Sequence, residues 1–77
     1  MIKHKLRIKE VRKKHKYQQK YIANILNVSQ SQYSRYELCY SIITFEQLTE
    51  LAFFYNTSTD FLLGITDCEI PYPRKNI

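Results

Sequence analysis

The chain has 77 residues, 44% of them hydrophobic, with one glycine and two prolines. This composition favours one compact helical domain and excludes a disordered or multidomain chain. No apolar run reaches the roughly 20 residues that cross a bilayer, and the first residues lack the apolar stretch of a signal peptide, so we expect a cytoplasmic protein. The formal net charge of +5 favours a polyanionic partner, either nucleic acid or an anionic membrane surface.

The first predicted helix covers residues 6–14. It is placed by periodicity, because Ile8 and Val11 share one face and no good N-cap precedes them. This helix lies in a strongly basic segment: residues 1–20 hold nine lysines and arginines against one glutamate, whereas residues 21–77 hold three basic and six acidic residues. We expect the basic segment to supply most ionic contacts to a polyanion, although a solvated helix face would have the same composition.

Two further helices are predicted over residues 19–26 and 30–37, joined by a three-residue turn that ends in Ser29. Ser29 is a good N-cap, and Gln32 three residues later completes a capping box. Asn27, the first residue of the turn, tolerates the left-handed backbone conformation. A tight turn of this kind between two short helices is typical of a helix-turn-helix.

The helix over residues 30–37 has two chemically different faces. Tyr33 and Tyr36 fall on the side that we expect to face the core. The opposite side carries groups that hydrogen-bond to base edges, since glutamine pairs with adenine, arginine with guanine and serine with several edges. These candidate base-reading residues are Gln30, Ser31, Ser34 and Arg35. The pattern predicts contact with the major groove of double-stranded DNA.

The caps also predict the last two helices. Thr44 and Gln47 repeat the capping box, and Ser58 begins a last short helix that Gly64 ends. Because no segment alternates with the period of a strand, we expect an all-α fold of five helices around one shared core. Residues 1–66 are assigned to this domain.

Residues 67–77 are predicted to form an extended C-terminal tail. They contain both prolines of the chain and no periodic pattern of apolar residues. Such a segment is ordered only where it docks on the rest of the protein.

The sequence offers no pattern for a metal site or for catalysis. Cys39 and Cys68 lie 29 residues apart without C-x-x-C spacing, and His4 and His15 do not complete a set of zinc ligands. Paired carboxylates and a glycine-rich phosphate loop are both missing from the pattern. We therefore expect no metal, no cofactor, no small-molecule ligand and no enzymatic activity.

Five short motifs resemble those of the phage-repressor family of helix-turn-helix proteins (Cro/cI, or XRE). They follow one another without gaps over about four fifths of the chain. They are Lys-Glu-Val-Arg (9–12), Gln19-x-x-Ile22-Ala23, Val28-Ser29-Gln30-Ser31, Ser34-Arg35-Tyr36-Glu37 and Asp60-Phe61-Leu62-Leu63-Gly64-Ile65-Thr66. The resemblance implies a five-helix, lambda-repressor-like domain that binds operator DNA, usually as a homodimer, and regulates transcription, with repression as the expected outcome.

The resemblance also implies roles for single residues. It places Gln30, Ser31 and Arg35 at the main base-reading positions, with Ser34 close by. It assigns phosphate contacts to Gln19, Ser29, Tyr40 and Ser41. Arg12 and Glu37 match a structural ion pair of the family that ties the first helix to the end of the recognition helix.

Residues 38–43 depart from the family pattern. Cys39 stands where a glycine would adopt positive φ, and the chain has no lysine or arginine between Arg35 and Arg74. This apolar loop leaves two interpretations open: weak ionic contact with DNA, or contact with another subunit. Exposed aromatic residues at positions 53 and 54, together with the tail, are a further candidate dimer surface.

Two alternative functions follow from the same features. The apolar loop suits a protein-interaction module such as an antitoxin or an assembly adapter. The basic segment suits a helix that lies on an anionic membrane surface. The protein-interaction module is kept as the alternative to DNA binding, and we expect no membrane partner.

Overall fold

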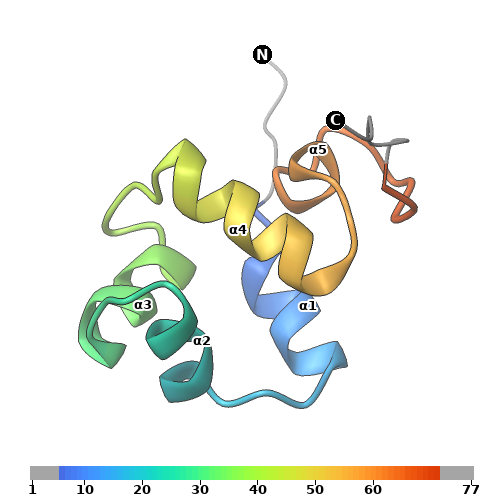
Figure 1. Ribbon diagram of the computed structural model, residues 1–77. Coiled ribbons are helices and arrows are strands. Elements are labelled where there is room, and N and C mark those ends of the chain that lie inside the picture. The colour runs from blue at the N-terminus through green and yellow to red at the C-terminus, as the bar shows by residue number, and fades with distance from the viewer. Residues whose placement is uncertain (1–5, 72–77) are drawn as a thin grey trace, which may run out of the picture.

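The computed structural model describes residues 6–71 and consists of short helices joined by tight turns (Figure 1). The helices are α1 (Ile8–Lys14), α2 (Gln19–Ile25), α3 (Gln30–Glu37), α4 (Phe45–Tyr55) and α5 (Thr59–Leu62). Residues 6–71 contain no strand, so the predicted all-α fold with five helices is confirmed. In this range, no helix combines the length and the apolar character that crossing a membrane requires. His4 and residues 72–77 of the predicted tail lie outside the described residues.

Three helices begin at the caps that the sequence predicts. Ser29 Oγ accepts a hydrogen bond from the backbone of Gln32 at 3.0 Å, but the reciprocal bond of the predicted capping box is not formed, so that part of the prediction was wrong. Thr44 and Gln47 form both bonds of their capping box, each 3.1 Å long, and Ser58 Oγ accepts a hydrogen bond from the backbone three residues later. A cap of this kind contributes about 1 kcal/mol. The cap at Ser29 fixes where α3 begins, and therefore which of its side chains face outward.

The prediction for the start of α1 was wrong by two residues. We predicted a helix from residue 6, but Arg7 is the N-cap and makes no side-chain capping bond. Its backbone N–H instead donates to the carbonyl oxygen of Leu62 at 2.7 Å, which joins the start of α1 to the end of α5. Local periodicity contains no signal for a bond between residues so far apart. α2 ends one residue earlier than predicted, with Leu26 as its C-cap.

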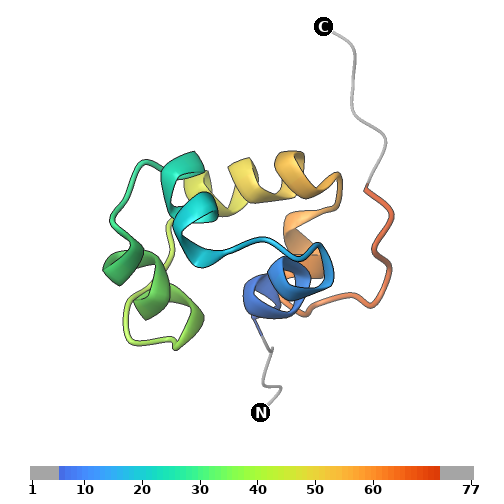
Figure 2. The ribbon, with the colours of Figure 1, turned by 90° about the horizontal axis from the view of Figure 1, so that it is seen from below.

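All five helices contribute side chains to one core. The buried hydrophobic residues are Ile8, Val11, Ile22, Ala23, Leu26, Tyr33, Tyr36, Leu48, Leu51, Ala52, Tyr55, Phe61 and Leu62. In both ribbon views α3 lies at one end of the molecule, and residues 67–71 lie at the opposite end (Figures 1 and 2). Helices of this length do not persist alone in water, so the shared core holds α3 in place.

The described part of the tail packs against the helical domain. Arg7 Nη2 lies 2.6 Å from Asp67 Oδ1, and Lys14 Nζ lies 2.9 Å from Glu69 Oε1. The hydroxyl of Thr57 donates to the carbonyl oxygen of Glu69 at 2.6 Å. These bonds place residues 67–69 along α1 and the turn before α5, away from α3.

Every helix is followed by a residue in the left-handed backbone region. These residues, with their φ angles, are Lys16 (61°), Asn27 (58°), Cys39 (61°), Asn56 (55°) and Gly64 (78°). After α3 the backbone N–H of Cys39 donates to Tyr36 and that of Tyr40 donates to Arg35, which is the bond pattern of a Schellman motif. A left-handed φ angle brings Cβ close to the backbone, which costs energy for residues that carry a Cβ atom. Cys39 and Lys16 therefore adopt unfavourable backbone conformations.

Replacing Cys39 with glycine should raise the free energy of unfolding by about 0.5–1 kcal/mol, because glycine removes the steric cost of positive φ and loses only part of that gain to chain entropy. Chemical denaturation of the two proteins measures the difference. Asn27→Gly is the matched control and should gain less, since asparagine tolerates this region. A loss of stability in Cys39→Gly would show that packing of the thiol outweighs the backbone strain.

Candidate nucleic-acid interface

The predicted orientation of α3 is confirmed. Tyr33 and Tyr36 are 0% and 5% exposed and anchor the helix in the core. Among the candidate base-reading residues, Gln30, Ser31 and Arg35 are exposed, and Ser34 is half-buried. The outer face of α3 is therefore polar and accessible.

The turn between α2 and α3 fixes the angle at which α3 is presented. Asn27 has φ 58°, and its backbone N–H donates to the carbonyl oxygen of Asn24 at 3.1 Å. The backbone N–H of Val28 donates to Ala23 at 3.0 Å. These bonds end α2, and the cap at Ser29 starts α3 directly afterwards. The chain reverses within three residues and has little freedom to change the orientation of the two helices.

A buried ion pair ties the C-terminal end of α3 to α1 and α2. Arg12 Nε donates to Glu37 Oε2 at 2.6 Å, and Arg12 Nη2 donates to Glu37 Oε1 at 3.1 Å. Gln19 Nε2 adds a third bond to Glu37 Oε1 at 3.0 Å. The Glu37 side chain is 1% exposed and that of Arg12 is 11% exposed. A pair of bonds with this fork geometry is directional, so it also sets the position of α3.

The electrostatics of this network keep both members charged. Burial acts to raise the pKa of Glu37, but its hydrogen bonds, above all the one from Arg12, outweigh burial, so the pKa is lowered. The hydrogen bond to Glu37 raises the pKa of Arg12. Burial raises the pKa of Tyr33 on the neighbouring turn, which keeps its phenol neutral. The ion pair is therefore fully formed at neutral pH.

Three of the four residues expected to contact phosphates, Gln19, Ser29 and Ser41, already have a hydrogen-bond partner within the protein. Gln19 uses one amide N–H on Glu37, which leaves its second N–H for a ligand. Ser41 Oγ accepts a hydrogen bond from Arg35 Nε at 3.1 Å. Ser29 is the exposed cap at the start of α3, and Tyr40 is 71% exposed. The bond of Gln19 joins α2 to α3, and the bond of Ser41 joins the loop after α3 to that helix. No sequence motif indicates either bond.

Among the described residues, the cations of the basic segment divide into paired and unpaired groups. Three of its described cations are paired with acidic residues: Arg7 with Asp67, Arg12 with Glu37 and Lys14 with Glu69. Those with exposed side chains and no ion pair among residues 6–71 are Lys9, Lys13, Lys16 and Lys20. Lys20 directly follows Gln19 in the first turn of α2, next to the contact with α3. The sequence analysis predicted the pairing of Arg12 with Glu37 but not the pairings of Arg7 and Lys14 with residues 67 and 69, which lie far away along the chain.

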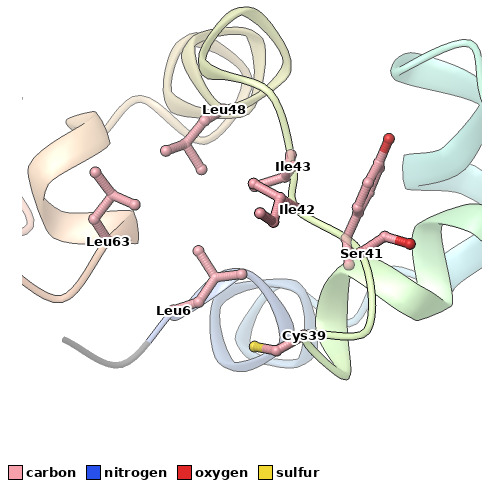
Figure 3. Close-up of a pocket in the computed structure, with 8 residues that line it drawn as sticks. Leu6, Cys39, Ser41, Ile42, Ile43, Leu48 and Leu63 are labelled. Carbon is pink, nitrogen blue, oxygen red and sulfur yellow. The ribbon is translucent and has the colours of Figure 1, made fainter. Parts of the chain in front are cut away.

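The loop between α3 and α4 and the first residue of α4 expose large apolar side chains. Leu38 is 51%, Tyr40 71%, Ile42 93% and Phe45 72% exposed. Behind this loop lies a cavity of about 240 Å³, whose apolar lining includes side chains that precede α1 and follow α5 (Figure 3). Its lining residues are Leu6, Tyr36, Cys39, Ser41, Ile42, Ile43, Leu48 and Leu63. The apolar character of the loop was predicted; the cavity was not, because it joins distant parts of the chain.

The aromatic residues of α4 differ in exposure. Phe53 is 59% exposed, as expected for a surface contact. Phe54 is half-buried, and its ring lies 5.3 Å from that of Tyr17 and 5.1 Å from that of Tyr55. The expectation that Phe54 is exposed was therefore wrong, because it packs into an aromatic cluster between α2 and α4.

Five short helices around one core, with a tight turn that presents the polar face of α3, define a helix-turn-helix domain. Comparison with known proteins identifies the particular group: the helix-turn-helix family matches residues 8–62, and the chain belongs to this XRE-type family.

Two relatives agree with that assignment, and one solved structure agrees with the fold. The chain is 43% identical over 58 residues to the HTH-type transcriptional regulator ImmR of Bacillus subtilis (strain 168). The aligned residues make up 75% of this chain and 46% of ImmR. It is 33% identical over 72 residues to the uncharacterized HTH-type transcriptional regulator YobD of the same strain, covering 92% of this chain and 64% of YobD. A crystal structure of a transcriptional regulator from Listeria innocua has the same fold, with a TM-score of 0.78 at 24% identity over 99% of this chain and 66% of that one. The chain thus spans about half to two thirds of these relatives.

Proposed function

We propose that this domain binds double-stranded DNA in a sequence-specific manner and regulates transcription, most simply as a repressor. The observation that carries the proposal is the division of α3 into a buried tyrosine face and an outer face with Gln30, Ser31 and Arg35 exposed. Exposed hydrogen-bonding side chains on the outer face of a helix suit the donor and acceptor pattern of the major groove. The family and its named relatives support the same function.

Backbone contacts would hold α3 in the groove. The start of α3 at Ser29 presents unpaired backbone N–H groups, which favour a phosphate. The second amide N–H of Gln19 and the exposed hydroxyl of Tyr40 are further donors, and Lys20 is the cation that follows Gln19. These groups lie on the two helices of the motif and the loop after it. Such contacts fix orientation, while the side chains of α3 choose the sequence.

A homodimer is the form in which we expect the domain to act. Two copies related by a two-fold axis would present two α3 helices to half-sites about 34–36 Å apart, one turn of the duplex. The exposed apolar residues Leu38, Ile42 and Phe45 favour a protein contact beside the recognition helix. A palindromic preferred sequence with this spacing would support the dimer.

Selection of duplexes from a random pool, followed by affinity measurements at several salt concentrations, tests the proposal. We expect a defined preferred sequence and a slope of log K against log salt of about −2 per bound domain, because the exposed lysines Lys16 and Lys20 would each neutralise one phosphate and contribute about 0.9. A slope of about −8 would instead mean that all nine cations of the basic segment contact phosphates. Failure to retain any duplex at low salt would overturn the proposal.

A protein-interaction function, such as that of an antitoxin or an assembly adapter, is the second candidate. The apolar loop with its 93% exposed Ile42 favours it, since single domains rarely leave a group of large apolar side chains uncovered. It predicts that the protein associates with a partner while retaining no duplex. The same binding experiment therefore separates the two functions.

A further inference from the structure

The side chain of Arg35 is held by the loop that follows α3. Its Nε donates to Ser41 Oγ at 3.1 Å. The backbone of the same residue is also engaged, since the carbonyl oxygen of Arg35 accepts hydrogen bonds from the N–H groups of Tyr40 at 2.9 Å and Ser41 at 3.2 Å. Three bonds therefore connect Arg35 to residues 40 and 41.

The turn at Cys39 creates this arrangement. Its φ of 61° reverses the chain directly after α3, so that Ser41 returns to the last turn of the helix. Ser41 lines the edge of the cavity behind the loop, and its hydroxyl points away from the cavity, towards the side of α3 (Figure 3). The hydroxyl thus meets the exposed arginine instead of filling the cavity.

This contact determines which donors of Arg35 remain for a ligand. A guanidinium carries five N–H donors in a fixed fork, one on Nε and two on each Nη. With Nε engaged by Ser41, the four N–H groups at the two Nη atoms remain. That end of the fork matches the O6 and N7 acceptors of a guanine in the major groove. Holding a flexible arginine in its bound rotamer lowers the entropic cost of binding.

We infer that Ser41 is a positioning residue that orients Arg35 for bidentate recognition of one guanine, and that it sets specificity at that base pair. The inference rests on the proposed function and replaces the expected phosphate contact of Ser41. Ser41 acts through Arg35 and touches no base. Its removal therefore affects discrimination at one position and leaves the rest of the binding site intact.

Four variants test the inference when their base preferences are measured on the selected duplex and its single substitutions: Ser41→Ala, Ser41→Thr, Arg35→Ala and the double variant Arg35→Ala/Ser41→Ala. Ser41→Ala should reduce the preference for guanine about 3- to 10-fold at one base pair, the one at which Arg35→Ala relaxes it further. The double variant should match Arg35→Ala, because the two residues act as a unit. Ser41→Thr keeps the hydroxyl and should restore the wild-type preference.

Two results for Ser41→Ala would overturn the role of Ser41 and leave the proposed function standing. One is an equal loss of affinity for all sequences, which indicates a phosphate contact. The other is an unchanged preference for guanine. An NMR measurement of Arg35 Nε–H exchange in the free protein checks the bond itself. Exchange should be slower in wild type and Ser41→Thr than in Ser41→Ala, and equal rates would exclude the bond. If the wild-type protein selects no sequence, the proposed function fails first, and the role of Ser41 fails with it.

Discussion

Replacing Glu37 with glutamine should lower the free energy of unfolding by about 3 kcal/mol, because it leaves the guanidinium of Arg12 without its counter-charge in a largely buried site. The Glu37 side chain is 1% exposed and receives bonds from Arg12 and Gln19. Equilibrium denaturation in urea measures the difference. For a domain of this size, a loss of about 3 kcal/mol is a large share of the total stability.

Two controls distinguish this effect from that of a surface ion pair. Asp67→Asn removes an ion pair in which the carboxylate is 98% exposed, and such pairs contribute about 0–1 kcal/mol. Replacing both Arg12 and Glu37 with apolar residues of similar volume should recover much of the stability, since no buried charge is then left unpaired. Equal losses for Glu37→Gln and Asp67→Asn would contradict the structural role of the buried pair.

The ion pair between Arg12 and Glu37 should also make the free energy of unfolding depend on pH in the acid range. The pKa of Glu37 in the folded protein is below the ordinary glutamate value of 4.5, so folding favours the carboxylate. The stability from this group is fully present above the unfolded pKa and is lost as the pH falls through the lowered folded pKa. In Glu37→Gln this part of the acid dependence should disappear.

The elements that carry local signals were predictable from the sequence. Ser29, Thr44 and Ser58 start helices because each places an oxygen beside an unpaired backbone N–H, and this depends only on residues three positions apart. The two faces of α3 followed from helical spacing, since Tyr33 and Tyr36 lie three residues apart. Local spacing alone was therefore enough to predict which side of α3 faces outward.

The parts that the sequence left undetermined depend on contacts between distant segments. Arg7 bonds to residues 62 and 67, which moves the start of α1 and places the tail. The bond between Arg35 and Ser41 depends on the left-handed turn at Cys39, a conformation that cysteine does not favour and that only the family pattern indicated. The interior of the domain was therefore easier to predict than the ion-pair and hydrogen-bond partners of its exposed charges. The spacing of residues along the sequence determines which face of a helix is buried, whereas the partner of a charge depends on how distant segments meet in the folded chain.

Reversing the charge of Arg35 should weaken binding to the preferred duplex by at least about 100-fold while leaving the fold intact. Arg35→Glu removes a contact with guanine that is worth about 1–3 kcal/mol, and it places a carboxylate against the negative groove, where like charges cost several kcal/mol more. Arg35 is exposed, so the free energy of unfolding should change by only about 0.5 kcal/mol. Fluorescence anisotropy with labelled duplex measures the affinity.

Lys14→Glu is the matched control, because it makes the same change of charge at the other end of the molecule. Lys14 pairs with Glu69, and residues 67–71 lie opposite α3 in both views (Figures 1 and 2). At physiological salt, charges separated by more than about 8 Å are largely screened, so Lys14→Glu should reduce affinity about threefold or less. If both variants lose the same affinity, binding depends on total charge and the specific role of α3 is refuted. If Lys14→Glu loses more than Arg35→Glu, the DNA lies along α1, and the interface must be assigned to the basic segment instead.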